Sequence, residues 1–253
     1  MNRPVPGAGP PPALAKAPFR VAAPSWVLPG TVAENCAWLR TRFPEVGLCL
    51  FEARACLDYG EDDLPPALAE LPLAWHAHLP MDLPWTEGQG AVWAIIEALL
   101  DKVAFLAPWA YVLHPPGPDA GGAQALLGLG ARFAAAGVEP ACVLLENVRG
   151  AALADVWDAA VAEGFSACLD LGHILTHDQQ GDLDLPGLRE RVRMLHAYAP
   201  GGLRAGEARH APLTRLDAAG RELLERLLGL LGPGGMLLLE NFDANDVSES
   251  LEY

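Results

Sequence analysis

The feature that most constrains the fold of this chain is a regular alternation of short apolar runs with longer segments of helical period. Most of the runs are continuous rather than alternating in polarity, which is typical of strands covered on both faces. Each is therefore predicted to be a buried strand of a parallel sheet. The predicted strands are Phe19–Ala23, Val46–Phe51, Leu73–His78, Ala110–His114, Ala141–Glu146, Ala167–Asp170, Val192–His196 and Met236–Glu240.

The segments between these runs have the apolar spacing of amphipathic helices. One stripe consists of Val92, Ile96, Leu99, Leu100 and Val103, and another of Leu223, Leu224, Leu227, Leu228 and Leu231. Eight strand–helix units favour an α/β protein of the closed (β/α)8 or TIM-barrel class. A doubly wound open sheet is the alternative, but it would usually have a Gly-rich phosphate turn after its first strand. Here Pro24-Ser25-Trp26 follows instead.

Length and composition agree with one barrel domain. The chain has 253 residues, and barrels of this class run to about 250. Residues 1–18 are rich in Pro, Gly and Ala and are predicted to form a flexible tail. We therefore expect a single TIM-barrel domain over residues 19–253.

The net charge excludes several classes of partner. The formal net charge of -15 disfavours binding to nucleic acids and to anionic membranes. Neither a signal peptide nor a membrane-spanning stretch is recognisable, so a cytoplasmic location is expected. The five cysteines are odd in number and lack a Cys-x-x-Cys pair, and three of them lie within or beside apolar strand-like runs, which indicates reduced, buried thiols.

Potential metal ligands recur where the predicted strands end. In barrels of this class the chemistry lies at the C-terminal ends of the strands. All seven histidines lie at or just beyond a predicted strand end, and none lies in a helix stripe. Carboxylates end three further strands. The resulting candidate ligands are His78, His114, Glu146, Asp170, His196 and Glu240.

A divalent ion requires several imidazole nitrogens and carboxylate oxygens at one point. Any one of these residues alone would more often be a loop cap or a helix N-cap. The convergence of the whole set at one rim favours a metal site. Glu146 is placed to bridge two ions, which in two-metal sites lie roughly 3.5–4 Å apart.

Four more residues are candidates for substrate binding. His76 shares a strand face with His78, so it is a ligand, a substrate contact or a packed residue. Asp82, Trp85 and Tyr198 follow strand ends and are predicted to line a cleft with it. No Gly-x-Ser-x-Gly elbow is present, and no cysteine has the context of a nucleophile.

On these residues the sequence resembles the xylose isomerase-like barrel superfamily, which includes endonuclease IV. The resemblance implies one metal held by His78, His114 and Glu146, and a second held by Glu146, Asp170, His196 and Glu240. A third would use His173 and His210, but Ala208 stands where the family pattern has an Asp. Two divalent ions, zinc or manganese, are therefore expected.

Within the superfamily, three segments are similar to the cobamide-remodelling phosphodiesterases, the CbiR branch. They are His76–Trp85, Leu169–His173 and Leu238–Phe242. The resemblance implies hydrolysis of the phosphodiester in the nucleotide loop of adenosylated cobamides, giving adenosylcobinamide phosphate and a nucleoside. Glu146 or Glu240 would orient or deprotonate the attacking water. His173 and His210 would donate hydrogen bonds to the phosphate or the leaving oxygen.

Three other functions stay open at this stage. A sugar isomerase or epimerase of the same superfamily would use one metal, held by Glu146, Asp170, His196 and Glu240. An abasic-site endonuclease fits the fold, but the acidic charge opposes it. A non-catalytic corrinoid carrier would bind a cobamide without converting it.

Overall fold

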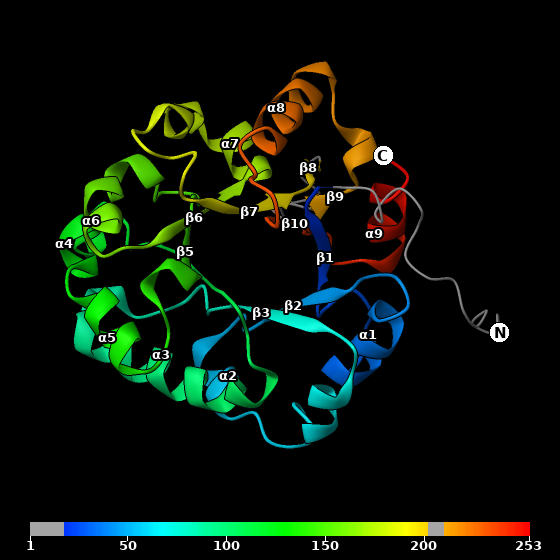
Figure 1. Ribbon diagram of the computed structural model, residues 1–253, viewed down its shortest axis with the longest axis horizontal. Coiled ribbons are helices and arrows are strands. Elements are labelled where there is room, and N and C mark those ends of the chain that lie inside the picture. The colour runs from blue at the N-terminus through cyan, green and yellow to red at the C-terminus, as the bar shows by residue number, and fades with distance from the viewer. Residues whose placement is uncertain (1–17, 202–209) are drawn as a thin grey trace.

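A computed structural model describes residues 18–201 and 210–253 of the chain. Within them, eight parallel strands close into a barrel, because β1 pairs with β2 on one side and with β10 on the other. The predicted closed (β/α)8 barrel is confirmed (Figure 1). Its strands are β1 (Arg20–Pro24), β2 (Glu45–Cys49), β3 (Ala74–His78), β4 (Tyr111–Leu113), β5 (Val143–Glu146), β6 (Ser166–Asp170), β7 (Val192–Ala197) and β10 (Met236–Leu239). Residues 1–17 of the predicted tail lie outside the described part.

Helices surround the strands as an outer layer (Figure 1). A two-stranded antiparallel ribbon of β8 (Ala199–Pro200) and β9 (His210–Ala211) lies outside the barrel sheet. Short 3-10 turns complete several connections. The helices are α1 (Val32–Leu39), α2 (Ala53–Leu57), α3 (Gln89–Val103), α4 (Gly122–Leu126), α5 (Leu129–Ala135), α6 (Trp157–Ala162), α7 (Leu171–His177), α8 (Ala218–Leu228) and α9 (Ala244–Ser250).

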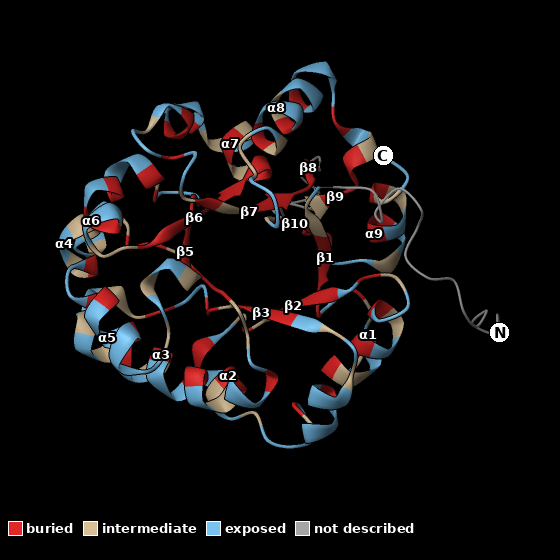
Figure 2. Cartoon of the chain, viewed as in Figure 1, coloured by how far each residue is buried: buried red, intermediate tan, exposed pale blue. Residues whose placement is uncertain are grey.

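The barrel strands are buried on both faces, as their continuous apolar runs predict. Side chains that point inward form a small central core, and those that point outward pack against the helices in a larger one. Figure 2 shows the ring of buried strands inside helices whose outer faces are exposed. The central core consists of Ala22, Ala110, Val112, Leu144, Cys168, Met194, Met236 and Leu238.

The predicted helix stripes are the faces that meet this sheet. All five residues of the first stripe are buried on α3. On α8, Leu224 and Leu227 are buried and their neighbours Leu223 and Leu228 pack against the core. Leu231 lies beyond the helix, because α8 ends at Leu228 and Gly229 forms its C-cap.

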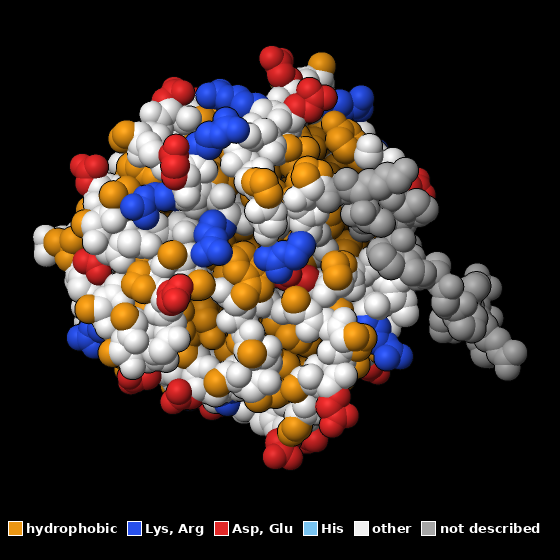
Figure 3. Space-filling model, viewed as in Figure 1, with side chains coloured by type: hydrophobic (Ala, Val, Ile, Leu, Met, Phe, Trp, Pro, Cys, Tyr) orange, Lys and Arg blue, Asp and Glu red, His pale blue; other side chains and the backbone are white. Residues whose placement is uncertain are grey.

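The cysteines, the surface charges and the helix lengths complete the description of the fold. All five cysteines are free thiols, and three of them are buried. Figure 3 shows Lys and Arg side chains scattered among Asp and Glu on the face drawn, with no single basic patch. Among the described residues, no helix has both the length and the apolar character needed to cross a bilayer.

Candidate metal centre

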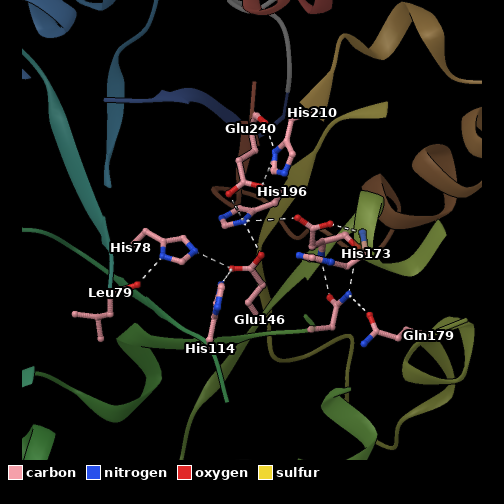
Figure 4. Close-up of polar contacts among 11 residues, drawn as sticks. His78, Leu79, His114, Glu146, His173, Gln179, His196, His210 and Glu240 are labelled. Carbon is pink, nitrogen blue, oxygen red and sulfur yellow. Dashed lines mark hydrogen bonds and ion pairs between the residues drawn. The ribbon is translucent and has the colours of Figure 1, made fainter. Parts of the chain in front are cut away.

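Glu146 lies at the centre of a cluster of histidines at the C-terminal ends of the strands. It is the last residue of β5 and is buried inside the barrel. One carboxylate oxygen, Oε2, is 3.0 Å from Nε2 of His78 and 3.4 Å from Nε2 of His114. The other, Oε1, is 3.1 Å from Nδ1 of His196. Three imidazoles from three different strand ends thus converge on one carboxylate (Figure 4).

Two more buried carboxylates surround His196. Its Nδ1 is 3.4 Å from Oε1 of Glu240 and 4.0 Å from Oδ2 of Asp170. Asp170 ends β6, and Glu240 follows β10 directly. His210 joins from β9, with its Nδ1 2.6 Å from the main-chain oxygen of Glu240. The structure therefore brings together all six side chains that the sequence predicts as ligands.

Carbonyl contacts fix the tautomers of two of these histidines. A carbonyl oxygen only accepts hydrogen bonds, so Nδ1 of His78 donates to the oxygen of Leu79 at 2.8 Å. Nε2 of a neutral His78 then turns its lone pair towards the carboxylate of Glu146. Two acceptors facing each other require a proton or a cation between them. His210 is fixed in the same way by its bond to Glu240, so its Nε2 also carries a lone pair.

The pKa shifts show how unevenly charge is distributed here. Burial raises the pKa of Glu146, but His196, His114 and His78 outweigh it and hold that pKa well below its usual range. Burial and then the charge of Glu146 raise the pKa of both Asp170 and Glu240 well above theirs.

The histidines respond mainly to burial. It lowers the pKa of His114 and of His196. Burial also lowers the pKa of His78, but the hydrogen bond to Glu146, the charge of Glu146 and the bond to the carbonyl of Leu79 together outweigh it, so the net pKa is raised. The cluster therefore places three carboxylates among imidazoles that are mostly neutral.

A divalent cation fits this donor set. Oδ2 of Asp170, Nε2 of His196 and Nδ1 of His173 are buried without a hydrogen-bond partner. Within residues 18–201 and 210–253, no lysine or arginine pairs with the three carboxylates. Ligands about 2.1 Å from an ion lie roughly 3.0–3.4 Å from each other at octahedral or tetrahedral angles. The contacts of Glu146 with His78 and His114 fall at these separations.

The mutual distances divide the donors differently from the family resemblance. Donor atoms of one set, His78, Glu146, His196 and Glu240, lie within 4.8 Å of one another. A second set within the same limit is Glu146, Asp170 and His173. Glu146 belongs to both sets, which agrees with its predicted bridging position. His114 contacts Glu146 but belongs to neither set.

The two histidines after the sixth strand are helical. His173 is in the first turn of α7, where its main-chain N–H donates to Oδ1 of Asp170 at 2.6 Å. His177 is the last residue of that helix and stacks on His173, with 5.3 Å between ring centroids. Burial lowers the pKa of His173 to about 4, so its ring is neutral at pH 7.

Among the predicted substrate contacts, His76 lies below the cluster instead of beside it. It is buried, and its Nδ1 is 2.7 Å from Oε1 of Glu45 at the start of β2. The indole N–H of Trp109 donates to the same oxygen at 2.6 Å. Nε2 of His76 occupies the space that a side chain at Gly47 would fill. His76 is therefore a packed residue of a lower barrel layer.

The other three predicted contacts have different surroundings. Trp85 lines the cavity above the cluster, whereas Asp82 and Tyr198 are not part of its described wall. Oδ1 of Asp82 instead accepts the N–H of Ala53 at 2.7 Å, at the start of α2. Tyr198 is buried and stacks flat on His210, with 3.5 Å between ring centroids. Tyr198 therefore packs against a histidine that lies beside the cluster.

The cavity itself has a volume of about 1230 Å³. His78, His114, Glu146 and Glu240 line it. Sequence reasoning missed several other wall residues, although most of them follow strand ends and so obey the same positional rule. They are Phe51, Met81, Arg149, Arg215 and Phe242. Ala208, where the family pattern has an Asp, lies outside the described residues.

No protein-family model matches the sequence, and no curated protein matches it. Solved structures do match. A D-tagatose 3-epimerase-like protein is 17% identical with a TM-score of 0.70, over 92% of this chain and 95% of that one. Endonuclease IV from Thermus thermophilus is 19% identical with a TM-score of 0.60, over 92% and 96%. The protein IOLI with a bound zinc atom is 12% identical with a TM-score of 0.64, over 92% and 93%.

Identities this low establish a common fold and leave the activity open. A xylose isomerase domain-containing protein from Salmonella typhimurium matches over 93% of this chain with a TM-score of 0.65. With the closed parallel sheet and its helical layer, these similarities show that the chain has the xylose isomerase-like (β/α)8 barrel fold.

Proposed function

We propose that this protein is a divalent-metal-dependent phosphodiester hydrolase that acts on the nucleotide loop of adenosylated cobamides. The observation that carries the proposal is the wall of the cavity. Histidines and carboxylates lie beside arginines and exposed aromatic rings in one space of about 1230 Å³. That combination suits a large substrate with an anionic ester and apolar rings.

The size of the cavity favours a substrate larger than a monosaccharide. Ligand sites usually have volumes of about 300–1,000 Å³ and bury most of the ligand. A cavity of about 1230 Å³ exceeds this range. A cobamide would use such a volume, whereas a single sugar would leave much of it to water.

Two arginines in the wall favour an anionic group in the substrate, beside the wall carboxylates Glu146, Glu240, Asp243 and Asp246. Arg149 and Arg215 line the cavity of a chain whose formal net charge is -15. Both residues are exposed, and the guanidinium group of Arg215 lies 3.8 Å from the carboxylate of Glu249. Guanidinium groups match phosphate oxygens in geometry and charge. Their presence supports a phosphodiester over a neutral sugar.

The apolar part of the rim suits a ring system. Phe51 and Phe242 line the cavity with ring centroids 5.6 Å apart, and Trp26 meets Phe51 at 6.3 Å. Trp26 is 44% exposed and Phe242 36%. Exposed apolar side chains grouped at a cavity mark a binding surface.

In the proposed reaction the six ligand side chains hold the metal. A divalent ion there supplies positive charge that stabilises the reacting phosphate and makes water more acidic. His210 is neutral at pH 7 because burial lowers its pKa to about 4. Since its Nδ1–H is held by Glu240, its Nε2 accepts a proton or a ligand bond instead of donating to phosphate. Arg149 and Arg215 would bind the phosphate oxygens.

The test is incubation of the metal-loaded protein with adenosylcobalamin and with non-adenosylated cobalamin, followed by mass spectrometry of the products. We expect adenosylcobinamide phosphate and a nucleoside from the adenosylated substrate. Arg149→Gln and Arg215→Gln should each raise KM by about tenfold, the effect of losing one charge-assisted hydrogen bond. Arg226→Gln is the matched control, because Arg226 is exposed and paired with Asp184 on the surface. Absence of product would refute the proposal.

A sugar epimerase is the second candidate. The set His78, Glu146, His196 and Glu240 is compact enough for a single ion, and one similar structure is that of a D-tagatose 3-epimerase-like protein. Proton exchange at carbon 3 of a ketohexose, followed by NMR in deuterated water, would support this alternative. Nicking of abasic duplex DNA, or tight cobamide binding without turnover, would support the endonuclease or the carrier.

A further inference from the structure

Two asparagines follow the two glutamates of the metal centre directly in the sequence. Asn147 comes after Glu146 at the end of β5, and Asn241 comes after Glu240 at the end of β10. Glu146 and Glu240 follow Leu144 and Leu238 of the central core by two residues and line the cavity. The two asparagine amides instead bond to the main chain of neighbouring segments. Both asparagines are fully buried.

Asn147 holds the main chain of Asp170 from both sides. Its Oδ1 accepts the N–H of Asp170 at 2.8 Å, and its Nδ2 donates to the carbonyl oxygen of Asp170 at 3.2 Å. The regular pairing of β5 with β6 stops at Glu146 and Cys168, two residues before Asp170. The side-chain amide thus replaces a neighbouring peptide group at the position where the strands have separated.

Gln179 holds Asn147 in this orientation. Its Oε1 accepts from Nδ2 of Asn147 at 3.1 Å, and its own Nε2 donates to the carbonyl oxygen of Val148 at 2.8 Å. Gln179 is itself buried. Every polar atom of the Asn147 amide is therefore used, which leaves it one orientation.

Asn241 does the same for the segment that carries His210. Its Nδ2 donates to the carbonyl oxygens of His210 and Ala211 at 3.0 and 2.9 Å. Its Oδ1 accepts the hydroxyl of Ser250 at 2.8 Å, and that hydroxyl also accepts the N–H of Leu213 at 3.0 Å. The C-terminal helix α9 is in this way tied to a histidine of the centre.

We infer that Asn147 and Asn241 are positioning residues, each of which fixes the main chain beneath a side chain of the metal centre that comes from a neighbouring segment. Asn147 sets the position of Asp170, and Asn241 sets that of His210. The repeated Glu-Asn dipeptide then has two parts, a glutamate that points inward and an amide that positions another residue of the centre. The inference rests on the proposed metal centre and is independent of the substrate.

The test is a cobalt(II) titration of the metal-free protein, with affinity and the visible d–d spectrum as readouts. Asn147→Leu keeps the volume of the side chain and removes its hydrogen bonds. Partners that orient metal ligands typically contribute about 10- to 100-fold in affinity. We expect Asn147→Leu and Asn241→Leu to weaken cobalt binding by that factor and to change the spectrum.

Asn35→Leu is the matched control. Asn35 is also fully buried and bonds through its amide to the main chain of Val27, Leu28 and Thr31, but none of these residues belongs to the centre. Asn35→Leu should lower the melting temperature as much as the other two variants do. Its cobalt affinity should stay within about twofold of wild type and its d–d spectrum should not change, because the hydrogen bonds that support the centre are intact.

Milder variants keep the inference testable if a leucine variant does not fold. Gln179→Met removes one partner of Asn147, and Ser250→Ala removes one partner of Asn241. Each should shift the cobalt spectrum in the same direction by a smaller amount. Wild-type affinity and spectrum in the asparagine variants, or an equal change in Asn35→Leu, would overturn the inference. A wild-type protein that binds no cobalt would instead refute the metal centre itself.

Discussion

Replacement of Glu146 by Gln tests the metal centre most directly. Glu146 lies within 3.4 Å of three imidazole nitrogens, so no other carboxylate of the cluster contacts as many ligands. Glutamine has nearly the same shape but lacks the charge. We expect the variant to lose metal affinity and phosphodiester hydrolysis while the barrel remains folded.

The size of the effect follows from binding linkage. Cobalt(II) at 100 times its Kd should stabilise the wild-type protein by about 2.7 kcal/mol. For a chain of this length that is a rise in Tm of about 5–11 °C. Loss of an orienting partner alone weakens metal binding by up to about 100-fold. If Glu146→Gln weakens cobalt binding by that factor, the same cobalt concentration equals the Kd of the variant. The remaining stabilisation is about 0.4 kcal/mol, a rise of about 1 °C.

The assay is thermal unfolding with and without cobalt, with Glu163→Gln as control. Glu163 also uses both carboxylate oxygens, because it accepts the N–H groups of Gly128 and Gly130 at 2.7 Å each. It lies outside the cluster, so its variant should keep the full metal-dependent rise in Tm. Equal rises in Glu146→Gln and wild type would refute the central position assigned to Glu146.

Three further predictions concern other parts of the structure. Gly172→Ala would place a methyl group on the ring of Tyr198, which stacks on His210, so it should weaken metal binding about tenfold; Gly181→Ala, with open space around it, should not. Asp182→Asn should cost about 1–2 kcal/mol, because one of two main-chain N–H groups loses its acceptor. Burial raises the pKa of Asp182, so the folded protein holds this proton more tightly, and stability from this group falls as pH rises from about 4 through the folded pKa. Urea unfolding between pH 4 and 8 should show a flatter profile in the variant. Burial also raises the pKa of Cys36 to about 12, so mass spectrometry after iodoacetamide treatment at pH 8 should find it unmodified until urea unfolds the chain.

The meeting of the six candidate ligands was predictable because a parallel barrel brings the ends of all its strands to one rim. The position of a polar residue that ends an apolar run can therefore be predicted without knowing which residues it contacts. His114 and Glu240 show how tolerant the rule is. Both lie one residue beyond their strands, yet both reach the cluster.

The layer of the barrel in which an inward-pointing side chain lies was not predictable. The two-residue period of a strand gives the direction of a side chain but not its layer. His76 and His78 point to the same side of β3, about 7 Å apart along the strand. That step takes His76 from the cavity to Glu45 in the layer below. The contacts of Tyr198 and Asp82 were not predictable for another reason, because their partners, His210 and Ala53, come from other segments of the chain.

The electrostatics explain why the residues are more informative together than singly. Glu146 alone would be a carboxylate well stabilised by three imidazoles. Asp170 and Glu240 beside it are costly to ionise as long as the site contains no cation, because burial and the charge of Glu146 raise the pKa of both. Three buried carboxylates are stable in their ionised form only beside a compensating positive charge. Their convergence is therefore stronger support for a bound cation than the identity of any one ligand.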